Sequence, residues 1–425
     1  MRDDPMHDDP LHSEVSRYAV VGARLRGREG TWCVLVERDI VTGIVPDVAG
    51  DRPPGAVDLR GQLLLPGFVD LHVHLDKAYQ LGELERLGED GGDGIEGALR
   101  ATSRLRDVLT PGEVGRNAQR LVDVMVAGGT VAARVHVEVS PSSDPQAVAL
   151  HVGLAAANPD LRMEFVAFAQ HGSTGHPQVA RRLAAAMGEG CTVVGGCPYA
   201  DEDPLGHLDH VIGLAVDTGA PLDLHLDLSD RADDILLDQV VPRVEKAGLQ
   251  GRVVVGHVTA LTAAPPATVR EIAAAVAGVG ITVVSIPTTD LYLSGRGSPQ
   301  APTRGVTRIA ELQAAGVPVA LASNNHENAF TPVTMPSLTH AGWLATLTNH
   351  LGTRAQQLRL LDAITTTPRA ATSMQVPGLT VGEPIGAVAL PVHDAVDVIR
   401  TAARPTWRFA AAGPRRIEPG AGPDR

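Results

Sequence analysis

Histidines at the ends of short apolar segments are the residues whose type and spacing best suit chemistry in this sequence. His72 and His74 stand two positions apart at the end of segment 67–74, so on a strand both side chains point to the same face. His225 lies near the end of segment 221–227 and could supply a third imidazole from the opposite side. Three neutral imidazole nitrogens with one open position suit zinc or ferrous iron. Such an ion lowers the pKa of bound water from about 15.7 to about 7, so these residues predict a hydrolytic centre with one divalent metal ion.

Two more histidines fall at comparable places. His136 lies near the end of segment 131–138, and His257 ends segment 252–257. A single histidine at a strand end is more often a satisfied core residue than a ligand, but five of them at equivalent heights are hard to explain that way. We therefore expect all five to surround one site.

The elements that must position these histidines alternate regularly along the middle of the chain. Short apolar segments are separated by Ala-rich and Leu-rich amphipathic ones, such as 178–187 and 269–279, and this alternation is typical of a parallel sheet with crossover helices. The expected strands are 67–74, 131–138, 163–169, 192–196, 221–227, 252–257, 281–286 and 317–323. Eight such units predict the α/β class and a closed (β/α)8 TIM-type barrel, whose active site is assembled at the strand C-termini.

The two ends of the chain have a different pattern. Short β-branched segments occur at 19–21 and 33–36 and again at 386–390, 396–399 and 406–409, and we expect all of them to be strands. We predict a small composite β-sandwich from residues 15–64 and 376–425, a barrel domain over 65–375 and a disordered tail over 1–14. The closely spaced glycines of 91–97 indicate a mobile, lid-like loop rather than a nucleotide-binding turn.

The composition and charge of the chain exclude several classes of binding partner. The 425 residues are 44% hydrophobic and carry a net charge of −13, without a Lys/Arg cluster, so nucleic acid and an anionic membrane surface are not expected partners. No apolar segment reaches about 20 residues, as a membrane-spanning helix requires. The three cysteines have neither disulfide nor zinc-ribbon spacing. We expect a cytoplasmic protein that binds a small molecule, with homo-oligomerisation left open.

A series of motifs supports a more specific interpretation. Residues 65–77 read LPGFVDLHVHLDK, and further matching segments follow in order at 134–138, 165–170, 223–227, 256–257, 285–289, 295–296 and 303–305. Together these segments resemble the amidohydrolase superfamily, in its branch of cytosine deaminase and N-isopropylammelide amidohydrolase. The resemblance extends over nearly the whole chain, from residue 20 to residue 409.

The resemblance implies roles for individual residues. His72, His74 and His225 would hold one catalytic metal ion, zinc or iron, and His257 would contact the bound water or the substrate. Gln170 would bind a polar edge of a heterocyclic substrate, and we expect His136 and Arg296, which belong to the matching motifs, to contact the substrate as well. Lys77 matches a lysine near the leaving group in the triazine-degrading branch, although a lysine at a barrel rim can also be merely solvated.

Two acids of the family pattern are absent. Leu228 stands where members of the family have a proton-shuttling Glu, and Asn324 stands where they have an Asp that is both metal ligand and general base. An amide carbonyl is a weaker ligand than a carboxylate and cannot act as a base. Asp227 faces the pocket if the strand continues past His225, and it is one candidate substitute. His326 and Glu327, just beyond Asn324, are two more.

Two functions therefore remain open from the sequence. The first is a metal-dependent hydrolase of a C–N bond in a small cyclic nitrogen compound, either a deaminase or an amidohydrolase. The second is a divergent member without this metal chemistry, either an enzyme of another reaction type or a ligand-binding protein.

Overall fold

The computed structural model describes residues 17–48, 55–89, 92, 94–140, 146–297 and 304–418. Its larger unit is a sheet of eight parallel strands that pair in chain order. These strands are β6 (Phe68–Val73), β7 (Thr130–Glu138), β8 (Arg162–Ala169), β9 (Val193–Gly196), β10 (Leu222–Leu226), β11 (Val253–His257), β12 (Thr282–Ser285) and β13 (Val319–Leu321). Each overlaps the segment predicted for it. Helices cover the outer face, so strands such as β7 are buried on both faces, which explains their continuous apolar sequences.

The sheet closes through the residues that follow β13. Asn324 N–H donates to the His72 carbonyl at 2.9 Å, and His74 N–H donates to the Asn324 carbonyl at 3.1 Å, which forms a parallel bridge beside Val73. The predicted (β/α)8 barrel is confirmed. This closure also fixes Asn324 beside the two histidines of β6.

The helices around the barrel begin with recognisable sequence signals. Thr110 and Glu113 form a capping box at the start of α3, with Pro111 in the first turn, and Thr353 with Gln356 does the same for α12. The helices are α1 (Leu81–Arg86), α2 (Gly94–Arg106), α3 (Pro111–Ala127), α4 (Ala147–Ala157), α5 (Pro177–Glu189), α6 (Pro204–Thr218), α7 (Leu237–Ala247), α8 (Pro266–Gly278), α9 (Pro287–Leu293), α10 (Ile309–Ala314), α11 (Leu338–Thr348), α12 (Arg354–Asp362), α13 (Thr366–Ala370) and α14 (Ala395–Arg400). The helical patterns predicted at 178–187 and 269–279 correspond to α5 and α8.

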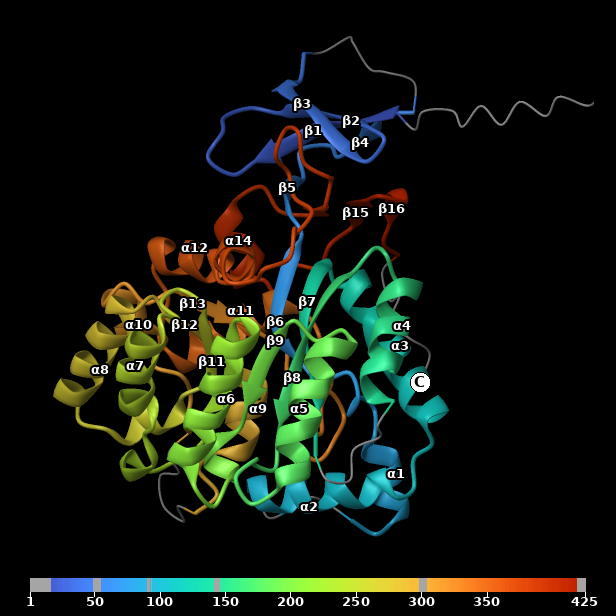
Figure 1. Ribbon diagram of the computed structural model, residues 1–425. Helices are drawn as coiled ribbons and strands as arrows, with labels where there is room; N and C mark the ends of the chain where they lie inside the picture. The colour runs from blue at the N-terminus through green and yellow to red at the C-terminus, as the bar shows by residue number, and fades with distance from the viewer. Residues whose placement is uncertain are drawn as a thin grey trace, which may run out of the picture.

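A second, mostly antiparallel sheet combines both ends of the chain, as predicted. It contains β1 (Arg17–Leu25), β2 (Trp32–Glu37), β3 (Ile40–Pro46), β4 (Val57–Asp58), β5 (Leu63–Pro66), β14 (Ala387–Leu390), β15 (Trp407–Ala410) and β16 (Gly413–Arg416). The pairing of β5 with β14 joins the two ends, and side chains from both, including Val20, Leu64 and Phe409, share one core. This sheet lies at one end of the barrel, and α1 and α2 lie at the opposite end (Figure 1).

Two expectations need correction. Residues 396–399 are not a strand but part of α14, because Asp394 caps Val396 N–H at 3.2 Å and the helix buries Val398 and Ile399 completely. The predicted loop 91–97 is shorter than expected, since α2 begins at Gly94, while residues 91 and 93 lie outside the described part of the chain.

Other expectations stay predictions. The tail over 1–14 lies outside the described residues, and the domain boundaries, the cytoplasmic location and homo-oligomerisation are not tested. Within the described part of the chain, no helix has the length and apolar character needed to cross a membrane.

Candidate active site

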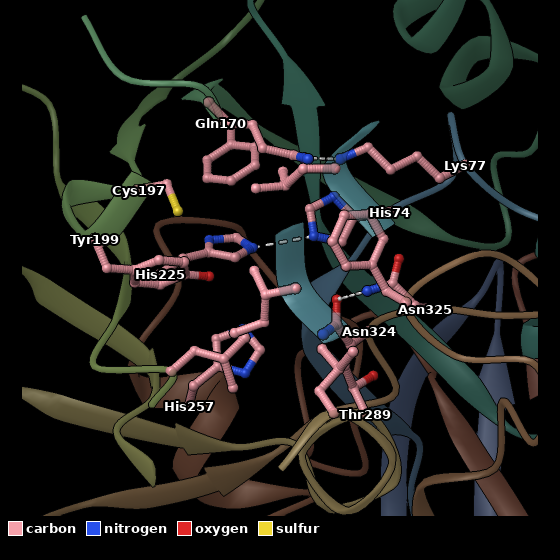
Figure 2. A pocket seen from close by; sticks show the side chains of 16 residues that line it. His74, Lys77, Gln170, Cys197, Tyr199, His225, His257, Thr289, Asn324 and Asn325 are labelled. Carbon is pink, nitrogen blue, oxygen red and sulfur yellow. Dashed lines mark hydrogen bonds between the residues drawn. The ribbon is translucent and has the colours of Figure 1, made fainter. Parts of the chain in front are cut away.

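Three of the predicted histidines meet at the C-terminal mouth of the barrel. The Nε2 atom of His225 on β10 lies 2.9 Å from Nε2 of His72 and 3.1 Å from Nε2 of His74. All three side chains are at least 95% buried, and His74 and His225 point toward one another in Figure 2. The register of the parallel strands produces this meeting, because β6 and β10 end at the same height on opposite sides of the barrel.

Burial keeps these three imidazoles neutral. Desolvation, followed by the charges of neighbouring histidines and other cations, holds the pKa values of His72, His74 and His225 well below the ordinary value. Neutral rings that turn their Nε2 atoms toward one point bring lone pairs together, which is favourable when a cation or a shared proton lies between them. The donor set therefore fits a divalent metal ion.

His257 stands beside this cluster with a carboxylate behind it. Its Nδ1 lies 2.7 Å from Oδ1 of Asp290, which is fully buried at the start of α9. Burial raises the pKa of Asp290, and the contact with His257 opposes the rise. Because a carboxylate accepts the Nδ1 proton, Nε2 of His257 keeps a free lone pair. One ring nitrogen of His257 lies within 4.8 Å of ligand atoms of His72 and His225.

His136 lies inside the barrel next to the cluster, on a buried network of charges. Its ring centroid is 4.1 Å from that of His72, and its Nε2 lies 3.1 Å from Oδ1 of Asp223. Arg134 binds the other oxygen of Asp223 at 2.8 Å and Glu164 at 2.7 Å. This network fixes the ring of His136, which is not among the side chains that line the pocket, while one of its ring nitrogens lies within 4.8 Å of ligand atoms of His72 and His74.

Lys77 and Gln170 meet on another side of the pocket. Lys77 Nζ donates to Gln170 Oε1 and lies 3.0 Å from Glu138 Oε2, and Arg106 also pairs with Glu138. Burial alone would raise the pKa of Glu138, but the charges of Lys77 and Arg106 outweigh it and hold the pKa well below the ordinary value. Lys77 is only 3% exposed, so it is a fixed part of the wall and not a solvated rim lysine.

Apolar side chains complete the pocket around these polar groups. They are Ile95, Leu99, Phe168, Leu228, Leu293 and Phe330, with Cys197 and Tyr199 nearby. The pocket has a volume of about 30 Å³, which suits a few waters. A larger cavity of about 360 Å³ by the same measure shares Lys77 as a wall residue and lies against α2, α3 and α4.

Asn324 and Leu228, at the positions of the two absent acids, both line the pocket. Asn324 is 1% exposed, with a left-handed φ of 63°, a conformation that Asn and Asp tolerate better than other side chains. Its Oδ1 accepts a hydrogen bond from Asn325 Nδ2 at 2.9 Å. Leu228 packs with Leu84 and Phe330 in an apolar cluster. The pocket thus has an amide and a hydrocarbon at these two positions.

The proposed substitutes and Arg296 are not brought into the pocket. Asp227 turns away, because its carboxylate accepts the N–H groups of Leu236 and Leu237 at 2.8 and 3.2 Å, and burial raises its pKa to about 7. Arg296 is exposed and donates to the Gly92 carbonyl at 2.8 Å.

His326 and Glu327 are also placed away from the pocket lining. His326 contacts Ser323 Oγ through Nε2 at 3.1 Å, and Glu327 is engaged through its backbone, with its carbonyl accepting Leu81 N–H at 2.8 Å. The geometry therefore favours structural roles for both of them, as it does for Asp227.

Sequence reasoning missed three acids of the site, of which Glu138 beside Lys77 is one. Asp290 directly follows the matching segment 285–289 and could have been found as the first carboxylate after the seventh strand. Asp223 precedes His225 by two positions on β10, so both side chains share the inner face of the barrel. The two-residue spacing between Asp223 and His225 therefore indicated a carboxylate inside the barrel that could bind a neighbouring histidine.

The chain also resembles known proteins in sequence. Residues 177–382 match the model of the amidohydrolase family. The chain is 28% identical over 328 residues to a pterin deaminase of Rhizobium rhizogenes, covering 75% of this chain and 73% of the relative. It is 26% identical over 214 residues to an N-isopropylammelide isopropyl amidohydrolase of a Pseudomonas species, covering 49% of this chain and 53% of the relative.

Solved structures show the same fold. A 5-methylcytosine deaminase of Klebsiella pneumoniae superposes with a TM-score of 0.87 at 24% identity, covering 94% of this chain and 98% of that one. An N-isopropylammelide isopropylaminohydrolase of Burkholderia multivorans gives a TM-score of 0.79 at 22% identity, with the same coverage. The chain therefore resembles amidohydrolases in sequence and has the barrel fold of these structures, and the predicted resemblance to the branch of cytosine deaminase and N-isopropylammelide amidohydrolase is confirmed.

The position of Asn324 gives a direct prediction about metal affinity. Asn324→Asp places an anionic oxygen beside the three neutral imidazoles, so we expect divalent metal to bind about tenfold more tightly or better, equivalent to about 1.4 kcal/mol or more. The measurement is competition for zinc against a chelator. Asn158→Asp adds the same charge at the end of α4, outside the pocket, and should leave the affinity for zinc unchanged. Unchanged affinity in Asn324→Asp would mean that this side chain does not reach the ion.

Proposed function

We propose that the protein is a metal-dependent hydrolase that cleaves a C–N bond in a small cyclic nitrogen compound, as a deaminase or ring amidohydrolase. The observation that carries the proposal is the meeting of three buried, neutral Nε2 atoms at the barrel mouth, 2.9 and 3.1 Å apart. The relatives support it, because they are named as enzymes that act on pterin and N-isopropylammelide.

The residues that would hold the metal are His72, His74 and His225. When bound there, zinc or ferrous iron supplies Lewis acidity that lowers the pKa of a water molecule toward about 7. The three ligands are neutral and bring no negative charge, and the position after β13 adds only an amide. We therefore infer that the ion keeps its full positive charge in the site and that its affinity depends on all three imidazoles.

His257 is the group of this chain best placed to move the proton. Its Nδ1 contacts Asp290, and one of its ring nitrogens lies within 4.8 Å of ligand atoms of His72 and His225. With the Nδ1 proton donated to the carboxylate, we infer that Nε2 carries the free lone pair. The carboxylate stabilises the imidazolium that forms when Nε2 takes a proton from water, and Nε2 can then deliver this proton to the departing nitrogen. His257 and Asp290 would thus do the work of the two absent acids.

Lys77 and Gln170 are positioned to bind the ring. Both line the pocket and are held to each other, and Lys77 is also held to Glu138. His136 is not a pocket-lining residue and would act by packing against His72. Arg296 is not proposed to bind the substrate, because it donates to the Gly92 carbonyl.

The test is a screen of purified protein for release of ammonia or amine from cyclic amidines, pyrimidines, pterins and triazines, combined with metal analysis. We expect near-stoichiometric zinc or iron and turnover of at least one ring. The absence of two acids favours a second candidate, a protein of this fold that binds a ligand without metal chemistry. Metal-replete expression that yields protein without metal would support this second candidate and overturn the first.

A further inference from the structure

The larger cavity, which lies against α2, α3 and α4, has no role in the proposed function. Its volume of about 360 Å³ is within the range of pockets that hold small molecules. Much of its wall is apolar and is formed by Leu105, Leu109, Pro111, Val114, Ala147 and Leu150. Among the described residues, Lys77 is the only one that lines both this cavity and the histidine pocket, so the two spaces are separate.

The charged side chains of this cavity balance one another. Those that line it, among the residues described, are two carboxylates and two cations: Asp76, Glu138, Lys77 and Arg106. Lys77 and Arg106 both pair with Glu138. A charged ligand would bring a charge for which this wall holds no surplus of the opposite sign, and a buried charge without a partner is costly. The wall therefore favours a neutral occupant.

His151 on α4 gives the wall an unused hydrogen-bond acceptor. Its Nδ1 lies 2.7 Å from the Ala147 carbonyl, and a carbonyl oxygen can only accept, so Nδ1 carries the proton. In the neutral ring the other nitrogen, Nε2, is then an acceptor. His151 is 1% exposed and lines the cavity, and Nε2 has no hydrogen-bond partner among the described residues.

Asp76 adds a second acceptor of this kind. Its Oδ2 accepts the Glu138 N–H at 3.4 Å, while Oδ1 is buried and has no hydrogen-bond partner in the described part of the chain. The cations are engaged, because Lys77 donates to Gln170 and pairs with Glu138, and Arg106 pairs with Glu138. The buried atoms of the cavity wall that lack a hydrogen bond within the described chain are thus acceptors, and an occupant must supply the donor.

We propose that this cavity is a second ligand site, which binds a neutral molecule with an apolar body and an N–H or O–H group that donates to Nε2 of His151. Burial of the apolar body against the leucines and Val114 supplies affinity. The hydrogen bond to His151 supplies selectivity, since a ligand without a donor leaves a buried acceptor unsatisfied. The site requires neither metal nor turnover, so the inference does not rest on the proposed function.

The experiment is calorimetric titration of the full chain with indole and with benzofuran, two fused rings of nearly equal shape. Indole has an N–H donor and no acceptor, whereas benzofuran has an oxygen in place of the N–H group. We expect indole to bind at least about fivefold more tightly, because only indole satisfies His151. Equal binding, tighter binding of benzofuran or no binding of either ring would overturn the inference.

His151→Phe tests the acceptor. Phenylalanine keeps a ring in the wall but has no Nε2 atom, so the affinity for indole should fall to about that for benzofuran, a loss of about fivefold or more. Calorimetric titration of the folded variant with both rings measures this change. A wild-type preference for indole in this variant would overturn the inference.

Leu150→Trp tests the location of the bound ring. The larger side chain occupies the cavity, so the affinity for indole should fall at least about tenfold. Val216→Trp is the matched control, because Val216 is 49% exposed on α6, and it should keep the wild-type affinity. Unchanged affinity in Leu150→Trp would place the ring elsewhere and overturn the inference. Leu150 is only half-buried, so this variant still decides the question if His151→Phe does not fold.

Discussion

We expect the wild-type protein to retain its metal through purification and His225→Ala to lose it. Removal of a partner behind a ligand already lowers metal affinity by about 10-fold to 100-fold, so removal of a ligand itself should exceed the upper value. The effect should be especially large here, because the three imidazoles lack support from a carboxylate ligand. Elemental analysis of the purified variant measures it.

The control must remove an equally buried histidine from outside the pocket. His151 on α4 is 1% exposed, and its Nδ1 contacts the Ala147 carbonyl at 2.7 Å. His151→Ala should keep full metal content. If His225→Ala also kept it, the ion would be held elsewhere and the proposed centre would be wrong.

The second large effect is expected from His257→Ala. A positioned general acid or base contributes about 10²–10⁴ in rate, or roughly 3–5 kcal/mol of barrier, and the absence of Glu and Asp leaves little to replace His257. We expect kcat on the substrate found in the screen to fall by about that factor while metal content is unchanged. Steady-state kinetics on metal-loaded protein is the measurement.

Asp290→Asn distinguishes positioning from catalysis. The amide oxygen can still accept the Nδ1 proton of His257, but the negative charge that stabilises the imidazolium is lost, so kcat should fall by less than in His257→Ala. His326→Ala removes a buried histidine outside the pocket lining and should leave kcat within about twofold. A wild-type kcat in His257→Ala would assign the proton transfer to another group.

The barrel and its histidines could be predicted because they depend on regular spacing. Each strand is a short apolar segment, and parallel strands end at one height, so His72, His74 and His225 were expected to meet before their distances were known. The prediction that the alternation of β10 continues to Asp227 was wrong. β10 ends at Leu226, and Asp227 adopts a left-handed φ of 52°, so its side chain no longer follows the alternation of the strand and caps α7 instead.

The remaining features depend on contacts between distant segments. The sequence offers Asp290 as the first carboxylate after the seventh strand, but its contact with His257 depends on how α9 folds at the end of that strand. The segment 396–399 has a strand-like composition, but packing of its apolar face and the Asp394 cap favour a helix.

The closure of the barrel at Asn324 has an evolutionary consequence. The backbone of Asn324 makes the hydrogen bonds that join the last strand to the first. Its left-handed conformation favours few residue types, chiefly Gly, Asn and Asp. The codons of Asn and Asp differ in one base, so a single mutation exchanges an amide for a carboxylate without disturbing the seam. Selection could therefore change the chemistry of this protein at that position while the architecture stays intact.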